Sequence, residues 1–186
     1  MNESLNEYPV SVRELLQSDI ELIANYWLGA DKLFLTKMGV DTTKIPALDG
    51  WNKMLTEQLA QINSEKKSYC IIWVLNNIPV GHSNINKIVV GEEAFMHLHL
   101  WKDSTRRKGM GMSFVRMTLP YFFENYNLKN LYCEPYALNP APNRTLKKIG
   151  FEFEKEYITT PGWLNFEQPV QRWVLSYEKY ISLFNK

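Results

Sequence analysis

The most informative segment of the chain is Arg106-Arg107-Lys108-Gly109-Met110-Gly111-Met112. It separates a strand-like run that ends at Trp101 from an amphipathic helix. Because glycine has no Cβ, the main chain can approach an anion closely here, and the N-terminus of the helix adds roughly half a positive charge. Three cations adjoin the same turn. The segment therefore predicts a binding site for a phosphate or pyrophosphate group.

Two common phosphate-binding motifs do not fit this segment. A dinucleotide-binding turn needs a third small residue where Phe114 stands, and a P-loop needs a Gly-Lys-Ser/Thr sequence that is absent. A different phosphate ligand is therefore expected. Taken alone, the turn also fits a plain helix start beside a solvated basic cluster, or a nucleotide-binding domain.

A second motif lies downstream of the first. Its sequence is Asn139-Pro140-Ala141-Pro142-Asn143-Arg144-Thr145-Leu146-Lys147-Lys148-Ile149-Gly150-Phe151. The two segments together resemble the GNAT superfamily of N-acetyltransferases, whose signature is Arg or Gln, two residues, Gly, one residue, then Gly or Ala, followed later by a helix that begins at Asn and ends in Gly-Phe. Arg106, Gly109 and Gly111 match the signature. The closer likeness is to the branch that acetylates the N-termini of ribosomal proteins.

The resemblance implies a fold and a cosubstrate. The expected fold is a single α/β (α+β) domain over residues 1–186, with a mixed, mostly antiparallel, splayed sheet of six to seven strands flanked by about four helices. Acetyl-coenzyme A is the implied cosubstrate, with its pantetheine arm between strands 94–101 and 128–133. The implied coenzyme contacts are Leu100, Trp101, Arg106, Arg107, Lys108, Gly109, Met110, Gly111, Met112, Asn139 and Asn143.

Hydrophobic periodicity and turn residues place the other elements. Residues 29–50 have mixed character and are expected to be irregular. Pro120 falls within the helix that begins around Lys108, so a kink or a restarted turn is expected there. The remaining expected elements are strand 10–15, helices from Ile20 and from Trp51 to Ile62, a hairpin of 69–75 and 78–85 around Asn76-Asn77, a helix over 139–149, and strands 151–158 and 171–177.

Acetyl transfer needs a base that leaves the amine neutral. In the resembling enzymes a carboxylate at the position of Phe95 is one common solution, and this chain lacks it. Side chains alternate between the faces of a strand, so His97 and His99 share the side of Phe95. Alternating histidines on this strand also look like those of the arylalkylamine acetyltransferases. We favour His97 as the base, then His99; the alternative is that both are hydrogen-bonded structural histidines.

The departing thiolate needs a proton. Family members commonly supply it from a Tyr in the second motif, and Leu146 occupies the matching position here. Tyr136 or Tyr132 could substitute, with packing as the alternative role for each. Glu134 could orient the amine or act as the base through water, with an exposed strand-end carboxylate as its alternative.

Composition limits the classes of partner. The 21 basic and 20 acidic residues give a net charge of +1, which disfavours nucleic-acid binding. Cys70 and Cys133 lie in apolar strand-like runs and indicate a reducing compartment. No signal peptide or membrane-spanning run is visible, so a cytoplasmic protein, monomer or homodimer, without a membrane partner is expected. Three scattered histidines and two distant cysteines give no metal-ligand spacing, so no metal is expected.

Two functions are consistent with these features. The first is direct acetyl transfer from acetyl-coenzyme A to a primary amine, on a small molecule or a protein N-terminus, in a ternary complex. The second is a non-catalytic acyl-coenzyme A sensor or interaction module, motivated by Leu146 and Phe95. The aromatic residues expected on the acceptor side, with core packing as their alternative role, are Trp27, Phe34, Trp51 and Trp163.

Overall fold

A computed structural model describes residues 9–101 and 109–184 of the chain, and these form one seven-stranded sheet in the order β1-β2-β3-β4-β5-β7-β6. The β4–β5 pair is parallel, and every other neighbouring pair is antiparallel. The expected mixed, mostly antiparallel sheet is confirmed. The strands are β1 Val10–Glu14, β2 Ser68–Leu75, β3 Ile78–Val89, β4 Glu93–Leu100, β5 Asn130–Cys133, β6 Glu152–Thr159 and β7 Gln168–Ser176.

The described residues contain six α-helices, two more than the sequence indicated. They are α1 Ile20–Gly29, α2 Lys32–Lys37, α3 Leu48–Ala60, α5 Met110–Tyr126, α6 Pro140–Ile149 and α7 Tyr177–Phe184, with short 3-10 turns at η1 Gln17–Asp19, η2 Thr42–Lys44 and η3 Asn63–Glu65. The expectation that residues 29–50 are irregular is wrong for α2. Asp31 caps this helix by accepting a hydrogen bond from the Phe34 amide at 2.9 Å.

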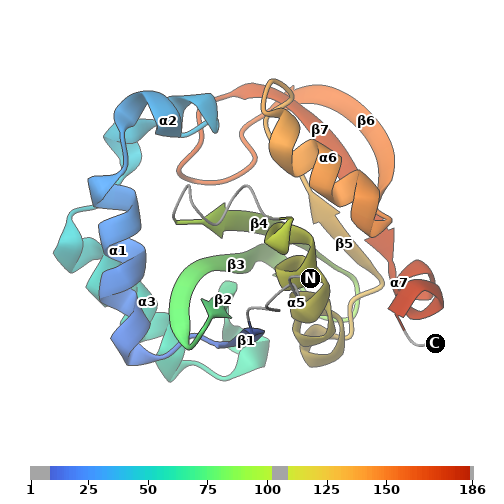
Figure 1. The fold of residues 1–186 in the computed structure, drawn as a ribbon, viewed down its shortest axis with the longest axis horizontal. Coiled ribbons are helices and arrows are strands. Elements are labelled where there is room, and N and C mark those ends of the chain that lie inside the picture. Colours follow the sequence, from blue (N-terminus) through green and yellow to red (C-terminus); the bar gives the residue numbers. More distant parts are fainter. Residues whose placement is uncertain (1–8, 102–108, 185–186) are drawn as a thin grey trace, which may run out of the picture.

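Helices cover both faces of the sheet (Figure 1). On β2, Tyr69, Ile71 and Trp73 pack in the core beneath α5, α6 and α7. The alternate residues Cys70 and Ile72 pack in a second core with α1 and α3. This central strand is therefore buried on both sides, which explains its continuous apolar sequence.

The helix α5 runs without a break through Pro120, so the expected restart of the helix does not occur. Pro120 cannot donate a hydrogen bond to the carbonyl of Arg116. Its neighbours Thr118, Leu119 and Phe122 are fully buried, and this packing holds the helix in one piece.

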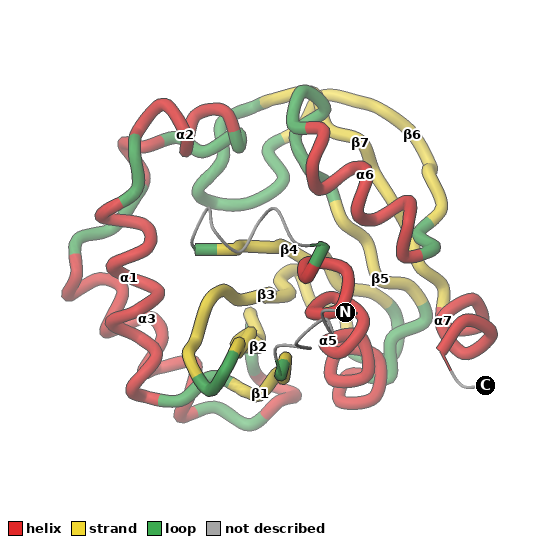
Figure 2. Tube along the Cα trace, viewed as in Figure 1, coloured by secondary structure: helices red, strands yellow, loops and turns green. Residues whose placement is uncertain are grey.

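The parallel ladder between β4 and β5 is short. It joins Glu93–Met96 to Asn130–Cys133 and ends there, whereas β4 continues to Leu100. In Figure 2 the two strands run in clearly different directions. The expected splayed opening is therefore present, next to the N-terminus of α5.

Candidate active site

A cavity of about 530 Å³ lies on the α1–α3 face of the sheet and reaches the opening between β4 and β5. Its walls come from α1, α3, the strands β2 to β4, the end of β5 and the loop between β6 and β7. Such a volume is typical of sites for small molecules and cofactors.

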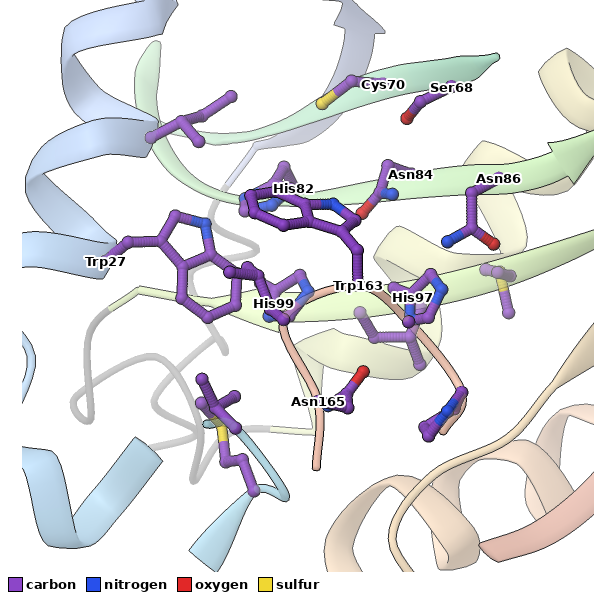
Figure 3. A pocket seen from close by; sticks show the side chains of 18 of the residues that line it. Trp27, Ser68, Cys70, His82, Asn84, Asn86, His97, His99, Trp163 and Asn165 are labelled. Atoms are coloured by element: carbon purple, nitrogen blue, oxygen red, sulfur yellow. The ribbon is translucent and has the colours of Figure 1, made fainter. Parts of the chain in front are cut away.

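Polar side chains from two neighbouring strands face this cavity (Figure 3). His97 and His99 come from β4, in keeping with the expected alternation. In the register of the sheet, His82 and Asn84 of β3 lie opposite His99 and His97. The two histidines singled out from the sequence are thus brought together on one wall, and a third joins them.

One ring nitrogen of His97 is buried at the cavity wall. Its Nε2 is buried and has no hydrogen-bond partner among the described residues. Burial lowers the pKa of His97 to about 4, with Lys87 lowering it further and Glu134 opposing the shift. The imidazole is therefore neutral at physiological pH and can accept a proton.

His82 is a site residue that the sequence analysis missed. Its Nδ1 accepts a hydrogen bond of 2.8 Å from the indole N–H of Trp101, and its ring stacks on that of His99 at 4.7 Å. Burial lowers the pKa of His82 to about 3. A polar alternation at His82, Asn84 and Asn86 on a strand was the signal that could have revealed this wall.

Glu134 is buried, so the expectation of an exposed strand-end carboxylate is wrong. Its side chain is only 2% exposed and forms a 2.6 Å ion pair with Nε of Arg172. The hydroxyl of Tyr157 donates to the same carboxylate oxygen. The guanidinium of Arg172 also lies over the rings of Phe95 and Tyr132, at 5.3 and 5.1 Å. One carboxylate oxygen of Glu134 therefore accepts from two donors.

The loop after β5 brings Tyr136 and Asn139 to the cavity. Asn143 holds this loop: its Nδ2 donates to the carbonyls of Asn139 and Tyr136, at 2.8 and 3.2 Å. Its Oδ1 accepts a 2.8 Å hydrogen bond from the indole of Trp173. Leu146 is fully buried in the core, so the position where the family commonly has a Tyr carries no acid here.

The start of α5 has a glycine in the left-handed conformation. Gly109 has φ 69° and lies at the N-cap of α5. A Cβ there would meet nothing within 4 Å, and one at Gly111 would lie at an ordinary 3.8 Å from Leu100 Cδ1. The side chains of Met110 and Met112 pack against the core. Arg106, Arg107 and Lys108 lie outside the described residues.

Aromatic rings form one side of the cavity. Trp27 stacks on Trp51 at 5.9 Å, Trp51 contacts Trp163 at 5.8 Å, and Trp27 meets His99 edge-on at 4.8 Å. All four rings line the cavity. Phe34, expected beside them, packs against the core between the helices. We refer to His99, Trp27, Trp51 and Trp163 as the aromatic wall.

The loop between β6 and β7 lies over the cavity next to His97. A Cβ added at Gly162 would be 3.3 Å from Cε1 of His97. The loop is held by the segment around η2: the Asp41 amide donates to the Leu164 carbonyl at 2.8 Å, and Asn165 Nδ2 donates to the Gly39 carbonyl at 2.8 Å. We refer to residues 39–44 and 161–165 together as the strap.

The model of the family described as "Acetyltransferase (GNAT) domain" matches residues 10–152. The chain belongs to the GNAT family of acetyltransferases. The resemblance inferred from the two sequence motifs is thereby confirmed. This GNAT protein is an N-acetyltransferase that uses acetyl-coenzyme A, as its family indicates.

Several solved structures have folds similar to that of this GNAT protein. The ribosomal L7/L12 α-N-acetyltransferase RimL, in complex with coenzyme A, aligns with TM-score 0.76 at 12% identity, over 95% of this chain and 98% of that one. Spermidine N-acetyltransferase from Vibrio cholerae, with coenzyme A and spermine, gives 0.75 at 15% identity, over 92% and 98%. Aminoglycoside acetyltransferase AAC(6')-Ib, with coenzyme A and kanamycin, gives 0.72 at 16% identity, over 96% and 100%. A search of curated proteins gave no match.

The described part of this GNAT protein contains no group of three or more His, Cys, Asp or Glu side chains placed to hold a metal ion. Over the same residues, 9–101 and 109–184, no helix is both long and apolar enough to cross a membrane.

Proposed function

We propose that this GNAT protein transfers the acetyl group directly to a neutral primary amine in the cavity, and that His97 removes the amine proton. The observation that carries the proposal is the buried Nε2 of His97, which has no partner among the described residues. It lines the cavity where β4 leaves β5, the opening in which the sequence resemblance implies the pantetheine arm.

The energetics require the amine to be neutral before it attacks. Deprotonating an amine with pKa near ~10.4 at pH 7 costs about 4.6 kcal/mol, whereas an α-amine near ~7.8 costs about 1 kcal/mol. Since burial lowers the pKa of His97 to about 4, its ring is a weak base and is neutral at pH 7. His97 can therefore act only on an amine that has already lost its charge, and desolvation in the cavity favours that loss for either kind of amine.

The other base candidates are less suitable. Glu134 is held by Arg172 and Tyr157, so we propose that it orients residues around the opening and does not accept the proton. His99 belongs to the aromatic wall and stacks on His82. His97 therefore stays our first choice and His99 our second.

Direct attack is supported by the state of the nearby thiol. Cys133 lines the cavity at the end of β5, and burial raises the pKa of its thiol well above its ordinary value. A thiol that stays protonated is a poor nucleophile for a covalent acetyl intermediate.

The thiolate of coenzyme A that leaves in the reaction needs a proton. We propose Tyr136 as the proton donor, because it lines the same end of the cavity.

The coenzyme site is proposed to run from β4 to α5. The main chain from Arg106 to Met112 would hold the pyrophosphate, with Leu100 and Trp101 beside the pantetheine arm and Asn139 at its far end. The space beside Gly109 is open, because a Cβ placed there would meet nothing within 4 Å. This open space supports the placement, since it leaves room for a ligand to approach the main chain. Asn143 would position Asn139 through the 2.8 Å hydrogen bond to its carbonyl.

We further propose that residues 1–186 act as one acetyltransferase domain in the cytoplasm, as a monomer or homodimer. All seven strands belong to one sheet, and the two cysteines are buried as free thiols. A net charge of +1 supports partners other than nucleic acids or anionic membranes.

Coenzyme binding and thiol release together test this function. We expect Arg106→Ala to weaken coenzyme binding about tenfold, as the loss of a charge-assisted hydrogen bond would. Gly109→Val should weaken it further, since the added side chain enters the phosphate space. Gly91→Val is the matched control, because Gly91 also has positive φ and open space around it, in the β3–β4 turn.

Two outcomes would contradict the proposal. Unchanged coenzyme affinity in both Arg106→Ala and Gly109→Val would remove the coenzyme from this turn. Tight coenzyme binding without thiol release across a broad amine panel would favour the non-catalytic sensor, which the buried Leu146 also suggests.

A further inference from the structure

We infer that the acceptor is a small amine carried on a flat, apolar body, and not a polycation or a protein terminus. The inference rests on the proposed function of the cavity as the acceptor site. It adds the chemical class of the acceptor and one residue that selects it, Trp163.

The aromatic wall is continuous along one side of the cavity. It runs from β4 through α1 and α3 to the β6–β7 loop, with successive ring centroids between 4.8 and 5.9 Å apart. Aliphatic side chains, including Ile23, Met54 and Leu55, line the cavity beside it. Flat rings of this kind gain most from stacking on another flat apolar group.

Few charged side chains line the cavity. The charged side chains that line the cavity, among the described residues, are Glu57, Lys67 and Glu134. Glu134 is already neutralised by Arg172, and Glu57 and Lys67 carry opposite charges. A molecule with three or more ammonium groups would lose hydration without gaining matching carboxylates. A body with one amine has no such penalty once that amine is neutral.

The strap forms one wall of the cavity. Hydrogen bonds from Asp41 and Asn165 join the two parts of the strap, and Lys44 Nζ also donates to the Asn165 carbonyl at 2.8 Å. An extended peptide that entered the cavity would have to cross the strap. Its backbone N–H and C=O groups would also need hydrogen-bond partners there. A volume of about 530 Å³ suits a compact small molecule instead.

Calorimetric titration of the coenzyme A-loaded protein tests the class of acceptor. The probes are 2-phenylethylamine and tryptamine, compared with spermidine, kanamycin and a short peptide with a free N-terminus. We expect the two aromatic amines to bind at least about tenfold more tightly than the other three. Equal or tighter binding of a polycation or the peptide, or absence of binding by both aromatic amines, would overturn the inference.

Turnover is measured separately, by thiol release and by the mass shift of each amine. Aromatic amines that bind without being acetylated would contradict the proposed function and leave the inference about the binding cavity intact. Acetylation of spermidine, kanamycin or the peptide, with weaker binding and turnover of the aromatic amines, would keep the function and overturn the inference.

A pair of variants tests the role of the aromatic wall. Trp163 is 50% exposed and Phe153, on β6 and outside the cavity lining, is 53% exposed, so truncation of either should leave the fold intact. We expect Trp163→Ala to weaken binding of 2-phenylethylamine about tenfold without changing coenzyme affinity. Phe153→Ala should change neither. Equal amine affinities in the two variants would refute the assignment of Trp163.

Discussion

At the scale of single residues, His97 combines a buried nitrogen, a neutral ring and a position at the end of the β4–β5 ladder. The loop at Gly162 lies close to the ring, since a Cβ added there would be 3.3 Å from Cε1 of His97. A side chain held in this way is ready for proton transfer and loses little entropy when substrate binds.

Replacement of His97 gives the most direct test of this role. We expect His97→Gln to lower kcat about 100-fold, which is typical of a lost general base, with coenzyme affinity unchanged. Because a more alkaline solution deprotonates the amine without help, the deficit should shrink as pH rises above the pKa of the amine. Steady-state kinetics over pH 6–10 measure both effects. Wild-type kcat with any accepted amine would exclude His97 from the mechanism.

Glu134 supports stability through Arg172, so its replacement should have a different signature. Glu134→Gln leaves the guanidinium without its nearest anion, and we expect a loss of about 2–3 kcal/mol in the free energy of unfolding. The loss should fall below that of a fully buried pair because Glu154 lies 3.6 Å from Arg172. Urea denaturation measures it.

An exposed ion pair provides the control for this variant. Glu152→Gln removes the partner of Lys179 at a site where both side chains are well exposed, so it should cost less than about 1 kcal/mol. Similar losses in the two variants would mean that the Glu134–Arg172 pair contributes no more than a surface contact.

Sequence reasoning succeeded for residues whose role depends on local order. Alternation along one strand was enough to place His97 and His99 on the same face. It could not find the partners of Glu134, because Tyr157 and Arg172 lie 23 and 38 residues away and reach it only through the β5–β7–β6 pairing. The alternation at His82, Asn84 and Asn86 marks a polar face, but the contacts of His82 with Trp101 and His99 form only through the β3–β4 pairing.

At the scale of elements, the loop between β6 and β7 determines how His97 is held. Gly162 is needed there because a Cβ would lie 2.8 Å from Oδ1 of Asn165, whose amide is already bound to Gly39. The loop therefore approaches His97 more closely than it could with any other residue at position 162.

Addition of one methyl group tests this close approach. We expect Gly162→Ala to displace the loop from His97 and to lower kcat about tenfold, because small misplacements at a reacting centre are costly. Coenzyme affinity should not change. Gly29→Ala, at the end of α1 where a Cβ meets nothing within 4 Å, is the control and should behave as wild type. Equal kcat values in the two variants would contradict a role for the loop.

The elements that could be predicted are those with strong local signals. Asn76 and Asn77 adopt φ values of 51° and 63°, as a tight hairpin requires, and Gly150 closes α6 with φ 114°. The helices α2 and α7 were missed because they are short and depend on tertiary contacts. Tyr180 of α7, for example, stacks on Phe123 of α5 at 4.6 Å.

At the scale of the whole molecule, the buried histidines couple stability to pH. Burial lowers the pKa of His82 to about 3 and of His97 to about 4, below the ordinary value of ~6.5 in an unfolded chain. Between about pH 4 and 6.5 the unfolded chain therefore binds more protons than the folded one. Stability is complete above this range and falls as pH decreases through it.

Calorimetric melting at pH 7.5 and 5.0 checks this dependence. The wild type should lose several degrees at the lower pH, and the double variant His82→Gln, His97→Gln should lose less. Glutamine at position 82 can still accept the hydrogen bond from Trp101. Equal losses in wild type and variant would assign the pH dependence to other groups.

The short ladder between β4 and β5 has a further consequence for the molecule. It means that the β1–β4 half and the β5–β7 half of the sheet are tied by few backbone hydrogen bonds. A coenzyme arm in the gap would act as a removable cross-link between them. At a hundredfold excess over its Kd, such a ligand contributes about 2.7 kcal/mol. The amplitude of motion between the two halves of the sheet would then depend on the fraction of protein molecules that have the cosubstrate bound.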